Sequence, residues 1–566
     1  MESRTIVIWG AGRIGRGFVA DLFQAAGYRI VFVDKSVDLV RQLQCAGQYT
    51  VVRIPATGPR EDVTIAGYTA LATSELDRVA AEVAAADLLA VAVYPDQFQA
   101  VASDLAYCLL RRRNERPDVP LDIILCTNLM HPGPQFRRAL EQALGATAYA
   151  YLQSQIGIVE AVVMRIASDA PEALQRTDPL IVWTNGYAEL PVDRCGFKGP
   201  LPAVPALRMV EDIRAEETRK MYTYNTVQAV LAYLGARRGY NLIVDCLADP
   251  DVRCKAEGAL DEASRALQAE YGFSSAEMAT WVDKVLKETS NPALGDTVKR
   301  YAADSQRKLG REDRLLGPTL LALKHGIKPQ HLVGAIAAAL RYVDPDDAGA
   351  RRVQSMVLSL GIEGALREIC GLTEADAGLV HAIVKAYGRQ LAEEEWAERA
   401  RRAYQLAFEY ESKYHGCGQC ALAAVLESLG MFNETLFEAA TPLSGGLGLA
   451  GDANCAALTA AALAIGMIYP RRRTHFDADR ENKYRAFSMV QQLREKYMQA
   501  YGSITCHDIH RHQMGRAFDL RSEVEREAFE AAGAHKDKCT SVVALAARWA
   551  LEIIATESMR DAFGED

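Results

Sequence analysis

The chain has 566 residues, of which 49% are hydrophobic and 24% charged, and its net charge at pH 7 is -9. A chain of this length exceeds a single hydrophobic core, so we expect three or four domains. The acidic balance, without a basic stripe, argues against a nucleic-acid partner.

The apolar stretches favour a cytoplasmic protein. The first residues enter an apolar run directly, without the basic region and apolar segment of a signal peptide. The longest apolar stretch, residues 456–469, is shorter than the roughly 18–20 residues that cross a bilayer. We therefore expect no membrane partner, while the sequence leaves the oligomeric state open.

Residues 6–17 begin as an apolar run and continue as a glycine-rich segment. Gly10, Gly12 and Gly15 have the G-x-G-x-x-G spacing, which allows a tight turn, the approach of a pyrophosphate and the packing of helix on strand. A second apolar run, residues 28–33, ends at Asp34. Its carboxylate can accept a hydrogen bond from a ribose 2′-OH and would repel the 2′-phosphate of NADP, which favours NAD. A βαβ unit without ligand is the alternative. The residues predicted to bind NAD are Gly10, Gly12, Arg13, Ile14, Gly15 and Asp34.

The organisation changes along the chain. Residues 1–195 alternate β-like and helical segments, as in a doubly wound Rossmann-type α/β domain, with strands expected at 88–94, 121–126 and 180–184. Ligands bind at the carboxyl ends of such strands, which draws attention to residues 94–96 and 126–128. Residues 196–391 have helical periodicity and predict an all-α domain, followed by a helical linker at 392–416 and a third, cysteine-rich helical domain at 417–566.

Lys220, Asn225 and Gln228 form a candidate catalytic group within one helical segment. On an ideal α-helix Asn225 and Gln228 share a face, whereas Lys220 lies about 140° from Asn225, so a long side chain or an irregular turn must close the gap. A lysine acts as a base at neutral pH only where burial or a neighbouring cation lowers its pKa. A surface lysine on an amphipathic helix is the alternative.

Stretches in residues 1–390 resemble, in order, the polyol-specific long-chain dehydrogenases, in particular mannitol-1-phosphate 5-dehydrogenase. The resemblance implies a Rossmann domain, a helical domain, an active site between them that needs no metal, and oxidation of a sugar alcohol by NAD. It also implies that Lys220 is the general base and that Asn225 holds the substrate oxygen. The stretches are residues 10–17, 196–202, 219–235, 291–292, 307–309 and 313–315.

Several polar positions depart from the pattern of that family. Gln228 stands where the family has His and cannot carry a proton, and Glu160 stands where Asn or Asp is usual. These departures predict a changed substrate, with lost activity as the alternative. Lys308, with Arg307 and Arg314 nearby, could bind a substrate oxygen or phosphate, because the forked guanidinium group of arginine matches phosphate geometry. For Arg314 the alternative is a surface ion pair with Glu312 or Asp313. The residues predicted to bind substrate are Lys308, Arg307, Glu160 and Asn128.

Five of the 12 cysteines fall from residue 417 onward: Cys417, Cys420, Cys455, Cys506 and Cys539. In a reducing cytosol such a group predicts metal binding or thiol redox chemistry rather than structural disulfides. Cys417 and Cys420 form a C-x-x-C at the start of an apolar helix, where we expect the helix N-terminus to lower the thiol pKa. The long spacing of the others favours a site assembled from separate helices over a zinc ribbon.

This segment resembles the C_GCAxxG_C_C family of redox-active proteins over about residues 417–550. The matching features, in order, are Cys420, the glycine-rich residues 445–451, residues 454–457 with Cys455, residues 502–506 and Cys539. The resemblance implies cysteine redox chemistry, a bound metal ion or an iron–sulfur cluster, and leaves these open. Five buried, inert cysteines are the alternative.

Together these patterns predict an NAD-dependent polyol dehydrogenase with a fused redox-active or metal-binding domain. Its small-molecule substrate is expected to be a sugar alcohol, in particular a hexitol phosphate such as mannitol 1-phosphate, which it interconverts with the keto sugar. The alternative function is an NAD-binding sensor of redox state or metal that has lost polyol oxidation.

Overall fold

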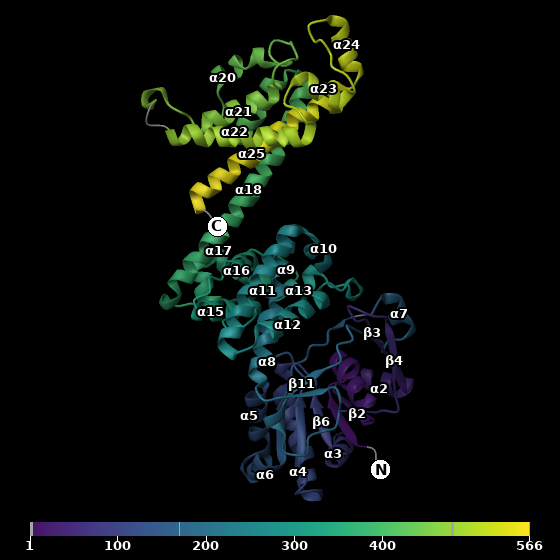
Figure 1. Cartoon of the computed structure of the whole chain (residues 1–566). Coiled ribbons are helices and arrows are strands. Elements are labelled where there is room, and N and C mark those ends of the chain that lie inside the picture. Colours follow the sequence, from purple (N-terminus) through teal and green to yellow (C-terminus); the bar gives the residue numbers. More distant parts are fainter. Residues whose placement is uncertain (1–3, 169, 477–479, 565–566) are drawn as a thin grey trace. The chain divides into compact units, whose positions relative to one another are not determined.

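The chain forms two compact units, Met1–Ile383 and Val384–Asp566. The computed structural model describes residues 4–168, 170–476 and 480–564. The first unit contains a parallel sheet with covering helices and a bundle of further helices, and the second is built from helices (Figure 1). Most of the segment predicted as a helical linker, residues 392–414, belongs to a long helix, α18 (Ala377–Tyr414), and the last two residues follow its end.

A six-stranded parallel sheet forms the core of the N-terminal region. Its strand order is β5-β2-β1-β6-β7-β8, which is the 3-2-1-4-5-6 order of a Rossmann fold. The predicted α/β class is confirmed, but the expected strand at 180–184 joins a different sheet. The strands are β1 (Thr5–Trp9), β2 (Arg29–Asp34), β5 (Thr69–Ala72), β6 (Leu88–Val91), β7 (Leu121–Leu125) and β8 (Ile156–Glu160).

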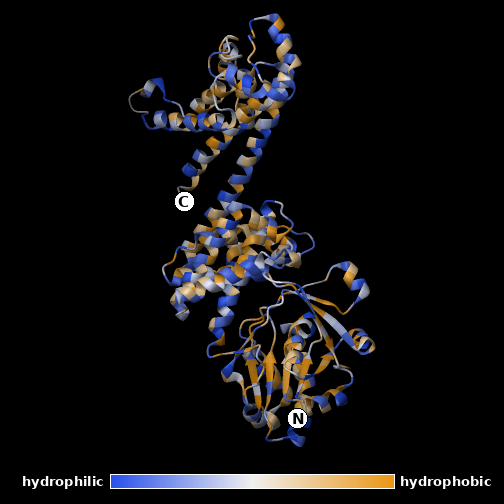
Figure 2. Ribbon diagram, turned by 45° about the vertical axis from the view of Figure 1, so that its right-hand side comes forward, coloured by the Kyte–Doolittle hydropathy of each residue, from blue (hydrophilic) through white to orange (hydrophobic). Residues whose placement is uncertain are grey.

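Both faces of this sheet are buried, which explains why its strands are mostly apolar, without the alternation of a half-exposed strand (Figure 2). In β1, Ile6 and Ile8 enter one hydrophobic core, whereas Val7 and Trp9 enter the core on the opposite face. Helices cover both faces, as a parallel sheet requires. These helices are α1 (Ala20–Ala25), α2 (Val37–Ala46), α3 (Leu76–Ala85), α4 (Phe98–Glu115), α5 (Pro132–Leu144) and α6 (Tyr149–Gln155).

Two smaller sheets and one helix complete the α/β part. The four-stranded sheet has the order β4-β3-β10-β9, and the two-stranded one pairs β11 with β12. The elements are β3 (Gln48–Arg53), β4 (Glu61–Ala66), β9 (Ala167–Ser168), α7 (Glu172–Thr177), β10 (Val182–Thr184), β11 (Leu190–Asp193) and β12 (Leu207–Val210).

The following region is helical, as predicted, and is centred on α9 (Thr226–Arg237). Residues 226–235 are all buried, because α10, α11, α13 and α16 surround this helix. The other helices are α8 (Ile213–Lys220), α10 (Ile243–Ala248), α11 (Pro250–Tyr271), α12 (Ser275–Thr289), α13 (Val298–Ala302), α14 (Ser305–Lys308), α15 (Leu316–Lys324), α16 (Gln330–Leu340) and α17 (Ala348–Cys370).

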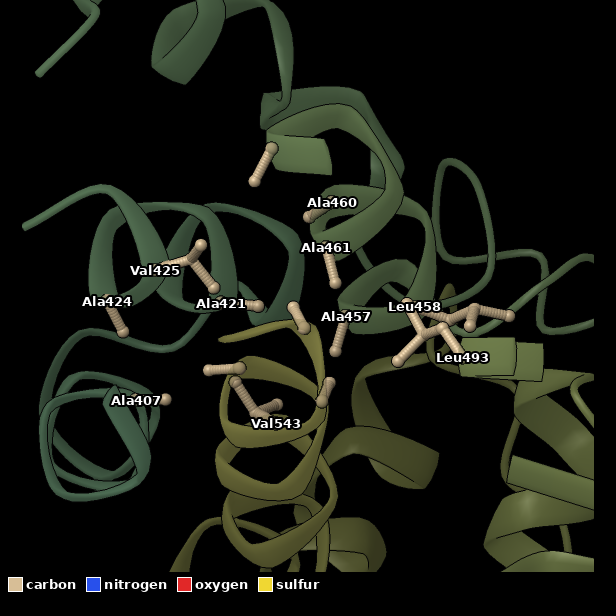
Figure 3. Packing of buried hydrophobic residues seen from close by; sticks show 14 of the residues in the cluster. Ala407, Ala421, Ala424, Val425, Ala457, Leu458, Ala460, Ala461, Leu493 and Val543 are labelled. Atoms are coloured by element: carbon tan, nitrogen blue, oxygen red, sulfur yellow. The ribbon is translucent and has the colours of Figure 1, made fainter. Parts of the chain in front are cut away.

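The C-terminal unit packs its helices through alanines. Ala421 and Ala424 of α19, Ala457 and Ala461 of α21, and Val543 of α25 lie in one buried cluster (Figure 3). Such small side chains let helix backbones approach closely. The helices are α19 (Cys417–Ser428), α20 (Glu434–Ala439), α21 (Ala456–Ile468), α22 (Arg480–Tyr501), α23 (Cys506–Met514), α24 (Glu523–Ala531) and α25 (Cys539–Phe563).

One helical segment of the described residues, Ala534–Phe563, is long and apolar enough to cross a membrane by length and composition. However, 61% of its most apolar window is buried, and Ala547 and Leu551 lie in the core of the unit. A core helix of a folded domain has the same composition. Arg548 and Glu552 interrupt the apolar run of α25, so the longest uninterrupted apolar stretch of the sequence is the shorter one at residues 456–469.

Candidate active site and cysteine cavity

The glycine turn after β1 has the geometry of a dinucleotide-binding loop. Gly10 has a φ of +103°, and a Cβ at Gly15 would lie 1.9 Å from the carbonyl oxygen of Gly10. A Cβ at Gly12 would meet no described atom within 4 Å, so this side of the turn is open. The helix that follows begins at Arg13 and contains a π-helical turn, Gly15–Val19. The turn therefore has room for a pyrophosphate where the motif needs it.

Asp34 lies at the end of β2 and contacts this turn. One carboxylate oxygen accepts the backbone N–H of Ala11 at 2.7 Å, and the other accepts that of Ser36 at 2.8 Å. Each oxygen keeps a further lone pair, so the carboxylate can still accept a ribose hydroxyl. Arg13 is exposed and Ile14 half-buried in the same turn. The structure thus brings the predicted NAD-binding residues to one place.

Lys220 ends α8, and its side-chain nitrogen meets Asn128, which follows the carboxyl end of β7. Nζ donates to Oδ1 of Asn128 at 2.5 Å. Burial, and after it the charge of Arg314, lower the pKa of Lys220 from 10.5 to about 7. Much of the amine is therefore neutral at neutral pH, as a general base requires.

A π-helical turn, Met221–Asn225, follows Lys220 directly. Hydrogen bonds in such a turn join residues five apart, so residues at this spacing lie over one another. Asn225 follows Lys220 by five positions, so the turn brings Asn225 toward the face of Lys220. Of the two ways expected to close the offset of about 140° in an ideal α-helix, a long side chain or an irregular turn, the irregular turn is present.

Asn225 and Gln228 are both buried. Nδ2 of Asn225 lies 3.2 Å from Sδ of Met221, and Nε2 of Gln228 donates to the hydroxyl of Tyr301 at 3.2 Å. The Tyr301 hydroxyl in turn donates to Oδ2 of Asp296 at 2.5 Å. Gln228 is therefore fixed in a buried chain of hydrogen bonds, but its amide cannot carry a proton.

Glu160 belongs to a cluster with His131 and Glu217, two residues that the sequence analysis missed. The backbone N–H of His131 donates to Oε2 of Glu217 at 3.1 Å, and its Nδ1 lies 3.1 Å from the same oxygen. Oε1 of Glu160 accepts the N–H of Gly133 at 2.7 Å. Burial and the charge of Glu217 raise the pKa of Glu160. His131 follows Asn128 by three residues, so a longer search beyond the end of β7 would have found it.

Lys308 is held by backbone rather than by an open site. Its Nζ donates to the carbonyl oxygens of Tyr301, at 2.6 Å, and of Ala303. Burial, and then the charges of Arg314 and Arg307, lower its pKa to about 7. Two of the three N–H groups of the ammonium form are thus used, which leaves one for a ligand.

Arg307 and Arg314 share one carboxylate, that of Asp313. Nε of Arg314 donates to Oδ1 at 2.7 Å, and Nη1 of Arg307 donates to Oδ2 at 3.2 Å. The pair of Arg314 with Asp313 was the alternative expected from the sequence, but Arg314 is buried rather than on the surface. Its Nη2 is buried without a hydrogen-bond partner among the described residues.

Four of the five C-terminal cysteines line one cavity of about 260 Å³. Each stands at the start of a different helix: Cys417 begins α19, Cys455 precedes α21, Cys506 begins α23 and Cys539 begins α25. A site assembled from separate helices is what the long spacing predicted.

The glycine-rich segment 445–451 closes against one of these cysteines. Gly446 has a φ of +70°, and a Cβ there would lie 2.8 Å from Cβ of Cys506. The backbone N–H of Cys506 donates to the carbonyl of Ala453 at 3.0 Å, and that of Cys455 donates to Ile504 at 2.8 Å. The glycines therefore allow the close approach that fixes two helix starts beside each other.

Cys420 does not line this cavity. Its Sγ donates to the carbonyl oxygen of His415 at 3.2 Å, and it borders a second cavity of about 430 Å³. Burial raises the pKa of all five thiols, with neighbouring acidic groups adding to it in Cys417 and Cys420. The expectation that a helix N-terminus lowers the pKa of the C-x-x-C thiols is therefore wrong, because desolvation of the thiolate outweighs it.

Comparison with known families gives three matches. Residues 4–206 match the mannitol dehydrogenase Rossmann domain, and residues 212–405 match the mannitol dehydrogenase C-terminal domain. Residues 414–553 match the family described as "Putative redox-active protein (C_GCAxxG_C_C)".

Solved structures with a similar fold include two dehydrogenases. One is the mannitol 2-dehydrogenase of Pseudomonas fluorescens in a ternary complex with NAD and D-mannitol, at 18% identity and a TM-score of 0.58. The other is a substrate-free D-sorbitol dehydrogenase, at 16% identity and a TM-score of 0.58. Each alignment covers 68% of this chain and 92% of the other. At these identities the similarity shows a shared fold.

Proposed function

The chain belongs to the mannitol dehydrogenase family, with a C_GCAxxG_C_C domain added, and from this we propose an NAD-dependent oxidoreductase that interconverts a hexitol phosphate and the keto sugar. The observation that carries the proposal is Lys220, whose pKa is lowered to about 7 beside the carboxyl end of β7. A catalytic base tuned to neutral pH at this edge of a parallel sheet is what alcohol oxidation needs.

In the proposed reaction, neutral Lys220 takes the proton of the substrate hydroxyl. Asn128, which accepts from Nζ, orients the amine, and Asn225 donates from Nδ2 to the oxygen that becomes the carbonyl. NAD, when bound at the glycine turn and Asp34, supplies the hydride acceptor. The negative charge of Glu217 favours the protonated form of Lys220 that results.

Arg314 supports a phosphorylated substrate. A buried guanidinium nitrogen without a partner favours an anionic ligand, and guanidinium groups match phosphate geometry. Lys308 keeps one N–H for the same group. The carboxylates of Glu160 and Glu217 accept hydrogen bonds, so they suit the hydroxyl groups of a sugar and would repel a phosphate.

One observation favours the second candidate, an NAD-binding redox or metal sensor without polyol oxidation. Gln228 replaces the expected His, and Tyr301 holds its amide. In either candidate, the four thiols of the cavity act as one site for thiol redox chemistry or for a metal ion or cluster, and Cys420 acts apart from them.

A test compares the natural chain with Gln228→His and Lys220→Met. We would measure NAD binding by calorimetry and NAD reduction with hexitols and hexitol phosphates. Turnover with a hexitol phosphate that Lys220→Met abolishes supports the proposal. Turnover with free hexitols only would contradict the phosphate. If neither the natural chain nor Gln228→His turns over any of them while NAD binds, the sensor candidate replaces the enzyme.

A further inference from the structure

His415, Glu530 and His535 form a compact cluster of metal-ligand atoms in the C-terminal unit. Nδ1 of His415 lies 2.8 Å from Nδ1 of His535 and 3.8 Å from Oε1 of Glu530, and Oε1 also contacts Nδ1 of His535. Atoms that bind one ion at about 2.1 Å lie at most about 4.2 Å apart. The three atoms therefore lie close enough together to share an ion.

Hydrogen bonding alone leaves one contact of this cluster poorly satisfied, that between the two Nδ1 atoms of His415 and His535. A neutral imidazole carries one N–H, and the other ring nitrogen offers a lone pair. If Nδ1 of His535 donates its hydrogen to Glu530, the lone pair of Nδ1 of His415 can contact only that same hydrogen, which is already bound to the carboxylate. If Nδ1 of His415 donates instead, the lone pair of His535 faces the carboxylate oxygen. A cation between the three atoms would accept all three lone pairs.

Glu411 supplies an independent observation. This side chain is 2% exposed, and Oε1 faces Nε2 of His535 at 3.5 Å, on the side of the ring opposite the cluster. Oε2 is buried without a hydrogen-bond partner among the residues described. A metal-bound histidine typically directs its other nitrogen to a carboxylate, which fixes the tautomer. With Nδ1 on an ion, Nε2–H of His535 would point at Glu411.

All four residues line the cavity that holds the cysteines. Side-chain exposures of 49% at His415 and 50% at Glu530 give an ion access from solvent, while that of His535 is 15%. The donor set is nitrogen and oxygen, which suits divalent first-row transition metals and differs from a thiolate site.

We propose that Nδ1 of His415, Nδ1 of His535 and a carboxylate oxygen of Glu530 bind a divalent transition-metal ion, with Glu411 orienting His535. This site is separate in its ligands from the four thiols, and it does not depend on the dehydrogenase reaction.

The test uses the full-length chain without an affinity tag, freed of metal and titrated with Co²⁺ under reducing conditions. Calorimetry gives stoichiometry and affinity, and absorption distinguishes nitrogen and oxygen ligands from thiolates, which add a charge-transfer band. We expect one Co²⁺ with nitrogen and oxygen ligands, counted apart from any Co²⁺ that the thiols bind and that the charge-transfer band reports. His415→Ala and Glu530→Gln should each weaken its binding by a factor of about 10 or more.

Matched controls locate the ion. His475→Ala removes an exposed histidine of the same unit. His131→Gln changes the cluster of His131, Glu160 and Glu217 in the other unit, whose ligand atoms are also close enough to hold an ion. Cys417→Ser/Cys539→Ser removes two thiols. All three should retain the nitrogen and oxygen spectrum. Unchanged binding in both His415→Ala and Glu530→Gln would overturn the proposal, as would loss of the ion in His131→Gln or in the cysteine variant. Glu530→Gln preserves side-chain size, so it carries the test if His415→Ala does not fold.

Discussion

The lowered pKa of Lys220 predicts the pH dependence of alcohol oxidation. The base must be unprotonated, so kcat/KM should rise about tenfold per pH unit below pH 7 and level off above it. With the ordinary value of 10.5, the rise would continue through the whole neutral range.

The magnitude follows from the two pKa values. A pKa of about 7 leaves about half of Lys220 neutral at pH 7, whereas a value of 10.5 leaves about 0.03% neutral. The surroundings of Lys220 therefore raise the active fraction by a factor on the order of 10³. Because burial is the larger cause, most of this gain should survive removal of Arg314.

The assay is NAD reduction from about pH 5.5 to 9.5 at constant ionic strength. Lys220→Met should remove the rising part of the pH profile of kcat/KM, its acid limb, and lower kcat by about 10²–10⁴-fold, the usual contribution of a general base. Arg314→Met should move the limb to higher pH, because it removes the cation that lowers the pKa and frees the Asp313 carboxylate. A limb near pH 10 in the natural chain, or an unshifted limb in Arg314→Met, would refute the reasoning.

Three further predictions concern the glycine turn, the thiols and the alanine core. Gly12→Ala should keep the free energy of unfolding but lower the NAD affinity at least about tenfold, whereas Gly15→Ala should destabilise the fold by about 1–3 kcal/mol. Calorimetry measures the NAD affinity and urea unfolding measures the stability. Equal effects of the two substitutions would contradict this prediction. Buried Cys455 and Cys506, with raised pKa values, should react with iodoacetamide at pH 7 far more slowly than a free thiol until denaturant is added; rapid labelling of the folded chain would speak against their burial. Ala461→Leu should destabilise the C-terminal unit by about 1–3 kcal/mol and leave NAD affinity unchanged, as urea unfolding and calorimetry would show; a neutral effect on stability would mean that the alanine contacts are loose.

The parts of the fold that local sequence determines were predictable. The apolar runs of β1 and β2 and the glycines between them sit next to each other in the chain, and each glycine has a single steric role. The helical character of the second region also follows from periodicity. The strand at β10 was expected, but its place in a separate sheet was not, because pairing with β3 depends on residues more than a hundred positions away.

The candidate site was predictable only in part, for the same reason. The spacing of Lys220 and Asn225 predicted either a long side chain or an irregular turn, but no pattern identifies a π-helical turn. Glu217 becomes part of the candidate site only through its contact with His131, which lies just beyond the end of β7 and is distant in sequence. Likewise the sequence placed Cys417 and Cys420 in one group of candidate cysteines, whereas in the folded unit they line different cavities.

The placement of four cysteines at four helix starts ties the chemistry of the cavity to the folding of its unit. A bond or an ion that joins any two of these sulfurs closes a loop of about 30–120 residues, which in chain-entropy terms is worth roughly 4–5 kcal/mol. The unfolded chain has no such site, so filling the cavity would favour the native state and emptying it would remove that support. The lifetime of this unit would then follow the supply of oxidant or metal around it.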